Sequence, residues 1–136
     1  MKKIKADEEV IAQLISSLEY GDDSDRKDAA RFLAKIAYRD TEVARGAIPD
    51  LISLLKDENG HIRGYAACAL GFLGAEDALD PLNELLDDFY TESDIVSTPG
   101  FVLNIDVAVA GVRRLYVREV AEEAIKMIEK SKEVGR

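Results

Sequence analysis

An internal repeat limits the possible folds of this chain more than any other feature. Residues 47–74, AIPDLISLLKDENGHIRGYAACALGFLG, have the pattern of two amphipathic helices joined by a short polar turn. Shifting this stretch back by 37 positions superimposes leucines, paired alanines and an arginine on residues of the same kind. The matched residues of the earlier copy are Leu14, Leu18, Arg26, Ala29, Ala30 and Leu33. Such a repeat predicts stacked units, each covering the apolar face of the next.

A third copy follows, and an insertion interrupts it. Its first half matches the central stretch at an offset of 31 positions, as Leu82 and Leu86 show. Its second half matches at an offset of 55 positions, as Arg118 and Ala121 show. The offsets differ by 24 residues, which places an insertion between the two helices of the third unit. We predict repeats at about 8–39, 41–75 and 77–131, an insertion at about 89–104, and a final helix over about 106–130.

The stretch LLKDENGHIRGYAACALGFLG resembles the HEAT repeat, and most closely the short HEAT-like repeats of the phycobilisome lyases. The residues that fit the family pattern are Leu54, Leu55, Asn59, Ile62, Arg63, Ala66, Ala67, Leu70 and Leu73. GAIPDLISLL is similar to the second helix of the armadillo repeat. The resemblance implies an all-α fold, a right-handed α-solenoid of three helical hairpins. It also implies that the second helices line a concave face, the usual docking surface of this family.

The alignment of the units predicts which residues form this docking surface. They are Lys27, Arg31 and Lys35 from the first unit, Cys68 and Phe72 from the second, and Glu119, Glu123 and Lys126 from the third, with Phe101 in the insertion. The surface would run from basic through neutral to acidic. The leading hypothesis is a small non-catalytic adaptor or scaffold that binds a protein or peptide on this face.

Charge and cysteine content exclude several other classes of protein. The 136 residues have a net charge of −9, and acids are mixed with the bases almost throughout, so nucleic acid and anionic membranes are poor partners. No run approaches the roughly 18–20 apolar residues that a membrane span needs. The single cysteine, Cys68, cannot form an internal disulfide, and we expect a cytoplasmic protein.

The sequence contains no convincing catalytic, cofactor or metal site. Arg26, Arg63 and Arg118 recur once per unit, so we expect them to bond turn carboxylates and carbonyls of neighbouring units rather than to act in chemistry. His61, the only histidine, is expected to face solvent at a helix start, about 10 Å along the helix from Cys68 and too far to share a metal. For Cys68 itself, burial as a small hydrophobic residue is the favoured role, although the alignment places it on the docking surface.

Two alternatives remain open beside the adaptor hypothesis. The insertion at about 89–104 is too apolar to be left in water, so it either covers the end of the last unit or binds a partner or a second copy. In the last case the protein would be a homodimer. The resemblance to lyase-type HEAT-like proteins implies the other alternative, a protein that handles a tetrapyrrole or another prosthetic group.

Overall fold

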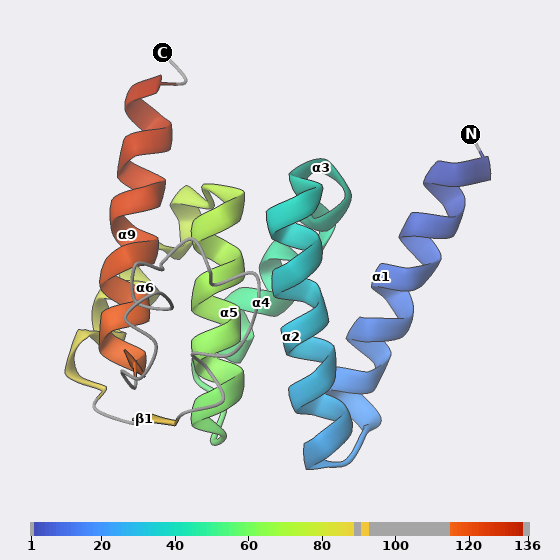
Figure 1. Cartoon of the computed structure of the whole chain (residues 1–136), viewed down its shortest axis with the longest axis horizontal. Helices are drawn as coiled ribbons and strands as arrows, with labels where there is room; N and C mark the ends of the chain where they lie inside the picture. Colours follow the sequence, from blue (N-terminus) through green and yellow to red (C-terminus); the bar gives the residue numbers. More distant parts are fainter. Residues whose placement is uncertain (1, 89–90, 93–114, 135–136) are drawn as a thin grey trace.

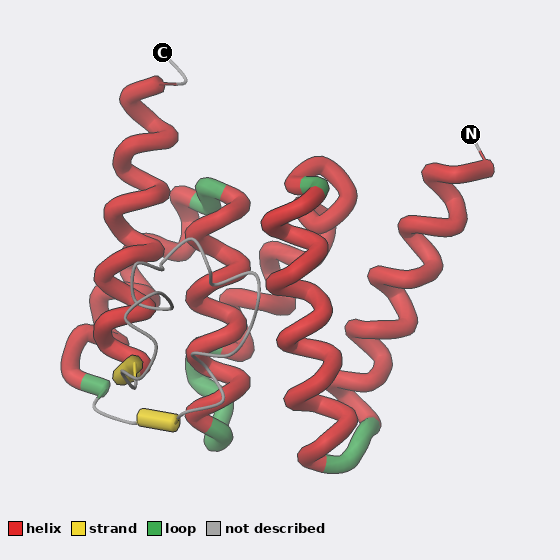
Figure 2. Tube along the Cα trace, in the orientation of Figure 1, coloured by secondary structure: helices red, strands yellow, loops and turns green. Residues whose placement is uncertain are grey.

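The computed structural model of the chain describes residues 2–88, 91–92 and 115–134 (Figure 1). These residues are helical apart from turns and one short strand pair (Figure 2). The α-helices are α1 (Lys2–Tyr20), α2 (Asp23–Arg39), α3 (Thr41–Ala44), α4 (Ile48–Leu54), α5 (Gly60–Leu73), α6 (Leu79–Glu84) and α9 (Val117–Val134). Three 3-10 turns lie between them, η1 (Arg45–Ala47), η2 (Glu76–Ala78) and η3 (Leu85–Asp87). The strands β1 (Thr91–Glu92) and β2 (Leu115–Tyr116) pair antiparallel.

The helices stack in chain order. α2, α5 and α9 lie side by side with α5 in the middle, and this row is called the α2–α5–α9 layer below (Figure 1). α4 and α6 pack behind this layer against α5 and α9, and α1 packs beside α2 at the outer end of the layer (Figure 1). The prediction of an all-helical repeat is therefore confirmed for the described residues.

Local polar contacts fix where the helices of this layer begin and end. The N-cap Asp22 accepts a hydrogen bond from the Asp25 backbone at 2.8 Å, and the Asp25 side chain accepts one from the Asp22 backbone. Asn59 caps α5 by accepting from the backbone N–H of His61 at 2.8 Å. At the other end of α5, Gly74 adopts φ 61°, a left-handed conformation that favours glycine and ends the helix.

The final helix is shorter than the sequence predicted. The predicted helix start at about residue 106 is wrong, because residues 115–116 form β2 opposite β1 and α9 begins only at Val117. The backbone N–H of Arg118 donates to the carbonyl of Asp88 at 2.9 Å. The chain therefore resumes the repeat beside the point where it left, which explains why the third unit tolerates the predicted insertion. Most of that insertion lies outside the described residues.

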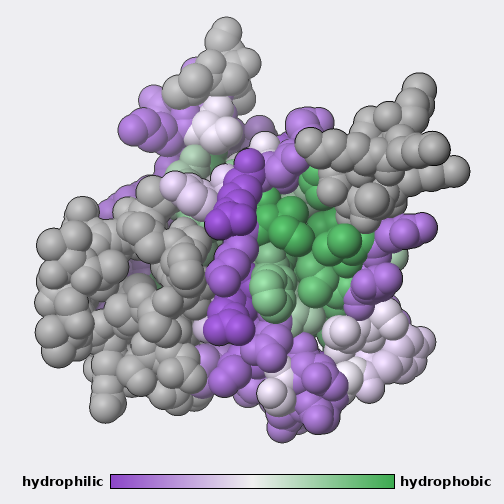
Figure 3. Space-filling model, turned by 45° about the vertical axis from the view of Figure 1, so that its right-hand side comes forward, coloured by the Kyte–Doolittle hydropathy of each residue, from purple (hydrophilic) through white to green (hydrophobic). Residues whose placement is uncertain are grey.

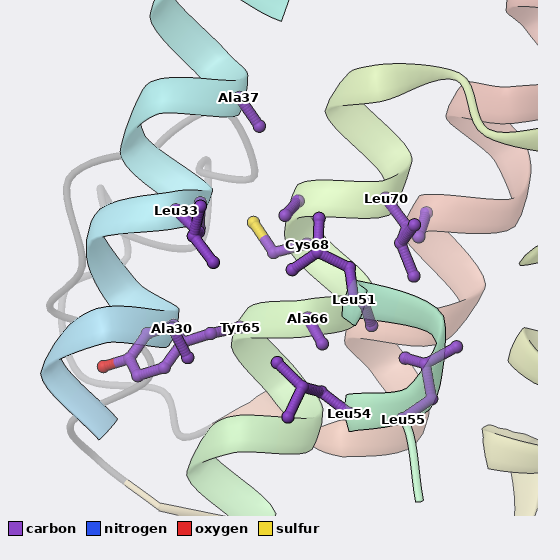
Figure 4. Packing of buried hydrophobic residues seen from close by; sticks show 14 of the residues in the cluster. Ala30, Leu33, Ala37, Leu51, Leu54, Leu55, Tyr65, Ala66, Cys68 and Leu70 are labelled. Atoms are coloured by element: carbon purple, nitrogen blue, oxygen red, sulfur yellow. The ribbon is translucent and has the colours of Figure 1, made fainter. Parts of the chain in front are cut away.

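Helix α5 forms the centre of the hydrophobic core. Twelve of its 14 residues are buried, because α2 and α9 flank it and α4 covers its back (Figure 4). Most of the buried α5 residues are small, and larger side chains such as Leu51 and Leu55 of the α4 region fill the space between the rows. A sandwiched helix needs small residues, because both neighbouring backbones approach it closely.

Two arginines join successive units through aspartates of the next turn. At the start of α2, Arg26 forms an ion pair with Asp57, and its Nε donates to the carbonyl of Leu18 at 3.0 Å. At the start of α5, Arg63 holds Asp88 with two hydrogen bonds, Nε to Oδ2 at 2.6 Å and Nη2 to Oδ1 at 3.2 Å. We call these two pairs the arginine–aspartate ladder.

The ladder is continuous because Asp57 takes part in both of its steps. Its carboxylate binds Arg26, while its backbone carbonyl accepts from Arg63 Nη1 at 2.9 Å. The side chains of Arg63 and Asp88 are only 17% and 15% exposed, so water competes weakly for these bonds. Arg118, the third repeat arginine, contacts Glu122 of its own helix, with Nη1 3.3 Å from Oε1.

The space around Gly71 shows how closely α5 and α9 pack. A Cβ added at this position would lie 2.8 Å from the Ala124 Cα and 3.0 Å from the Ala124 Cβ. We therefore expect Gly71→Ala to lower the free energy of unfolding by about 1–3 kcal/mol, although alanine is the better helix former. Chemical denaturation followed by circular dichroism measures this change.

Gly46→Ala is the matched control, because nothing lies within 4 Å of an added Cβ there. This variant should be neutral or stabilising by up to about 1 kcal/mol. Equal stability of the two variants would show that the α5–α9 contact is looser than described.

Candidate functional site

A strip of cations runs along the outward side of α2. Lys27, Arg31 and Lys35 are spaced by four residues, so they lie on one side of the helix, and we call them the basic strip. All three are half-buried, and the Arg31 side chain is 39% exposed. Asp28 lies 3.3 Å from Arg31 and offsets part of the charge at that position. The strip is a local cluster of positively charged residues on a chain with a net charge of −9.

An exposed aromatic ring, which the sequence analysis missed, lies next to the strip. The guanidinium carbon of Arg31 and the Nζ of Lys35 are 5.8 and 5.4 Å from the centroid of the Phe32 ring. These are cation–π distances, and Phe32 is nevertheless 45% exposed. The signal that could have found it is its position: Phe32 falls outside the buried α2 stripe of Ala29, Ala30 and Leu33.

The centre of the predicted docking surface requires a correction. Cys68 is only 4% exposed and lies among buried residues of α2 and α5, so it cannot line an accessible surface (Figure 4). Burial raises the pKa of its thiol, which keeps it neutral and unreactive. Phe72 is half-buried, and its ring packs against Tyr38 of α2 with the centroids 5.1 Å apart. Phe72 and Tyr38 therefore provide the aromatic boundary between α2 and α5.

The acidic end of the predicted surface lies on α9. Glu119 and Glu123 are half-buried and four residues apart, and Lys126 Nζ lies 3.8 Å from a carboxylate oxygen of Glu123. The Lys126 side chain is 73% exposed. α5 separates α9 from α2, so the structure does not bring these residues into contact with the basic strip. Phe101 lies outside the described residues.

The prediction that His61 faces solvent is wrong. His61 is only 9% exposed, and its ring stacks on the ring of Tyr65 with the centroids 6.4 Å apart. A helix start is normally solvated, but almost the whole of α5 is enclosed by its neighbours, and the first turn is no exception. His61 is thus part of the packing of α5.

Candidate sites for small ligands are sparse in the described part of the chain. Within it, no group of three or more His, Cys, Asp or Glu residues could hold a metal ion. A cavity of about 300 Å³ is lined by Arg45, Ile48, Gly74, Ala75, Glu76 and Asp77. Arg45 donates from Nη1 to the carbonyl of Leu73 at 2.9 Å, so this wall of the cavity belongs to a contact within the second unit.

None of the helices that the structure describes is both long enough and apolar enough to cross a bilayer.

Comparison with known proteins identifies the repeat. The HEAT repeats family matches residues 9–93, which is more than half of the chain. The chain belongs to the HEAT-repeat family. HEAT repeats commonly mediate protein–protein interaction and are generally non-catalytic. The match is to HEAT repeats in general, so likeness to the phycobilisome lyases, and with it tetrapyrrole handling, stays a prediction. No curated protein matches the chain.

The burial of Cys68 predicts slow thiol chemistry. In the native protein near pH 8, a thiol-reactive disulfide reagent should label Cys68 at least about 100-fold more slowly than in guanidinium chloride, because both access and thiolate are lacking. The absorbance of the released thiolate measures the rate. Similar labelling rates in the native protein and in guanidinium chloride would show that Cys68 is accessible in the native protein.

Proposed function

We propose that this HEAT-repeat protein is a non-catalytic adaptor that binds a protein partner across the α2–α5–α9 layer. The proposal includes the finer architecture, a right-handed solenoid of three hairpins whose second helices form the concave face. It also includes a cytoplasmic location, since the lone cysteine is reduced and buried. The observation that supports it most is the basic strip, a local reversal of charge on the layer where this family docks its partners.

The charge pattern of α2 favours a role in partner recognition over a role in stabilising the fold. The chain has 27 acidic and 18 basic residues, so most of its surface repels an acidic partner. On α2, by contrast, Arg31 and Lys35 are neighbours on one side of the helix and both lie over the Phe32 ring, and Arg31 also contacts the carboxylate of Asp28. Such a patch steers an acidic partner and fixes its orientation.

Charge reversal on the strip tests the proposal. The double variant Arg31→Glu and Lys35→Glu should lose at least about 90% of the partner captured by the wild-type protein from its native host, since each reversal replaces attraction with repulsion. Quantitative mass spectrometry of the captured proteins measures the loss.

The control is Lys56→Glu, which reverses an exposed lysine in the turn between α4 and α5, and it is compared with the single strip variant Lys35→Glu so that the change in net charge is the same. If the strip variant and this control retain the same partners equally, the α2–α5–α9 layer is not the docking surface. Circular dichroism of both variants checks that the fold is kept.

A further inference from the structure

An apolar surface lies beside the basic strip and extends it onto α1. Val10 of α1 and Phe32 of α2 are 46% and 45% exposed, so a partner can reach both side chains. Each has a half-buried apolar residue four positions later, Leu14 and Ile36, on the same side of its helix. Figure 3 shows the result: hydrophobic residues gather between α1 and α2, next to a column of hydrophilic residues.

These four residues form one surface rather than separate exposed side chains. Leu14 and Ile36 pack against the hydrophobic core, so the exposed Val10 and Phe32 continue the core outward. α1 and α2 contact each other. The cations of the strip hold Phe32 along one edge of the surface. We call Val10, Leu14, Phe32 and Ile36 the apolar surface.

We propose that the apolar surface and the basic strip together bind an acidic amphipathic helix of the partner protein. The helix would place its apolar side on the apolar surface and its acidic edge against Arg31 and Lys35. This inference rests on the proposed function and names the kind of partner. Charge complementarity supports the choice, because the two charged groups that lie over the Phe32 ring, those of Arg31 and Lys35, are both positive. An apolar groove with a charged rim is a common way to bind a helix.

The dimensions fit a short helix. Lys27 and Lys35 are eight residue steps apart, so the strip extends about 12 Å along α2. A partner helix of about three turns would cover it and reach α1.

A nucleic acid or an anionic membrane would also meet the strip, but the net charge of −9 repels an extended polyanion or a charged surface. An isolated acidic helix is small enough to avoid most of that repulsion.

A designed peptide tests this inference directly. The probe is a fluorescein-labelled helical peptide of about 18 residues with leucines on one side and glutamates on the other, read by fluorescence anisotropy. We expect binding to the wild-type protein, a loss of about tenfold or more in affinity for both Phe32→Ala and Lys35→Glu, and weaker binding in high salt. A peptide with lysines in place of the glutamates should bind at least about tenfold more weakly than the probe.

Two matched variants control for nonspecific effects. Tyr20→Ala removes an aromatic ring that is 82% exposed, and Lys56→Glu reverses an exposed lysine; both should keep the affinity within about twofold. The inference is overturned if the acidic and basic peptides bind equally, if neither binds, or if Phe32→Ala leaves the affinity unchanged. It is also overturned if sedimentation shows a dimer that Phe32→Ala converts to a monomer, since a second copy would then occupy the surface.

The two proposals can fail separately. If charge reversal of Arg31 and Lys35 removes the natural partner while Phe32→Ala still binds the probe as the wild type does, the adaptor function stands and the helix inference falls. If the natural partner survives charge reversal, the proposed docking surface itself falls.

Discussion

The rest of the structure depends on the contact between Arg63 and Asp88. It joins the start of α5 to the turn that follows α6, and Arg26 and Asp57 repeat the same contact one unit earlier. A helical hairpin cannot bury both of its apolar sides alone, so it needs a neighbour in a fixed register. Burial of these charges costs desolvation energy. Two parallel hydrogen bonds between Arg63 and Asp88 offset that cost, and Arg63 donates further hydrogen bonds to turn carbonyls. The ladder thereby favours one register over others.

That register determines which surfaces remain for a partner. Because α5 is enclosed by α2, α9 and α4, it offers the solvent little beyond the edge of Phe72. The contact at Gly71 brings α9 so close that even a methyl group does not fit. Among the described residues, α5 therefore offers a partner few side chains, and its neighbours offer more. Cations and exposed apolar side chains meet on α2 and α1, and α9 presents Lys126, whose side chain is 73% exposed.

The parts of the fold that repeat could be predicted from the sequence, and the parts that do not repeat could not. The helices of the first two units follow from spacing at three and four residues, which reflects the side of each helix that is buried. The start of α9 was misplaced, because the residues before it keep helical spacing while 115–116 bond to β1. Burial of Cys68, its favoured role, is confirmed, whereas its place on the docking surface and the solvent exposure of His61 were wrong. Alignment gives a position on a helix, but the degree of enclosure depends on the neighbouring helices. Phe32 was missed because a single aromatic residue outside a stripe has no periodic signal.

A double-mutant cycle between Arg63 and Asp88 tests the role of the ladder most directly. Stability of Arg63→Met, Asp88→Asn and the double variant, measured by chemical denaturation, should give a coupling energy of about 1–3 kcal/mol, since both side chains are largely shielded from water. The exposed pair Arg118 and Glu122, with side chains 39% and 46% exposed, provides the comparison and should couple by about 0.5 kcal/mol or less. Additive effects at Arg63 and Asp88, within about 0.3 kcal/mol, would contradict the view that this contact sets the register of the units.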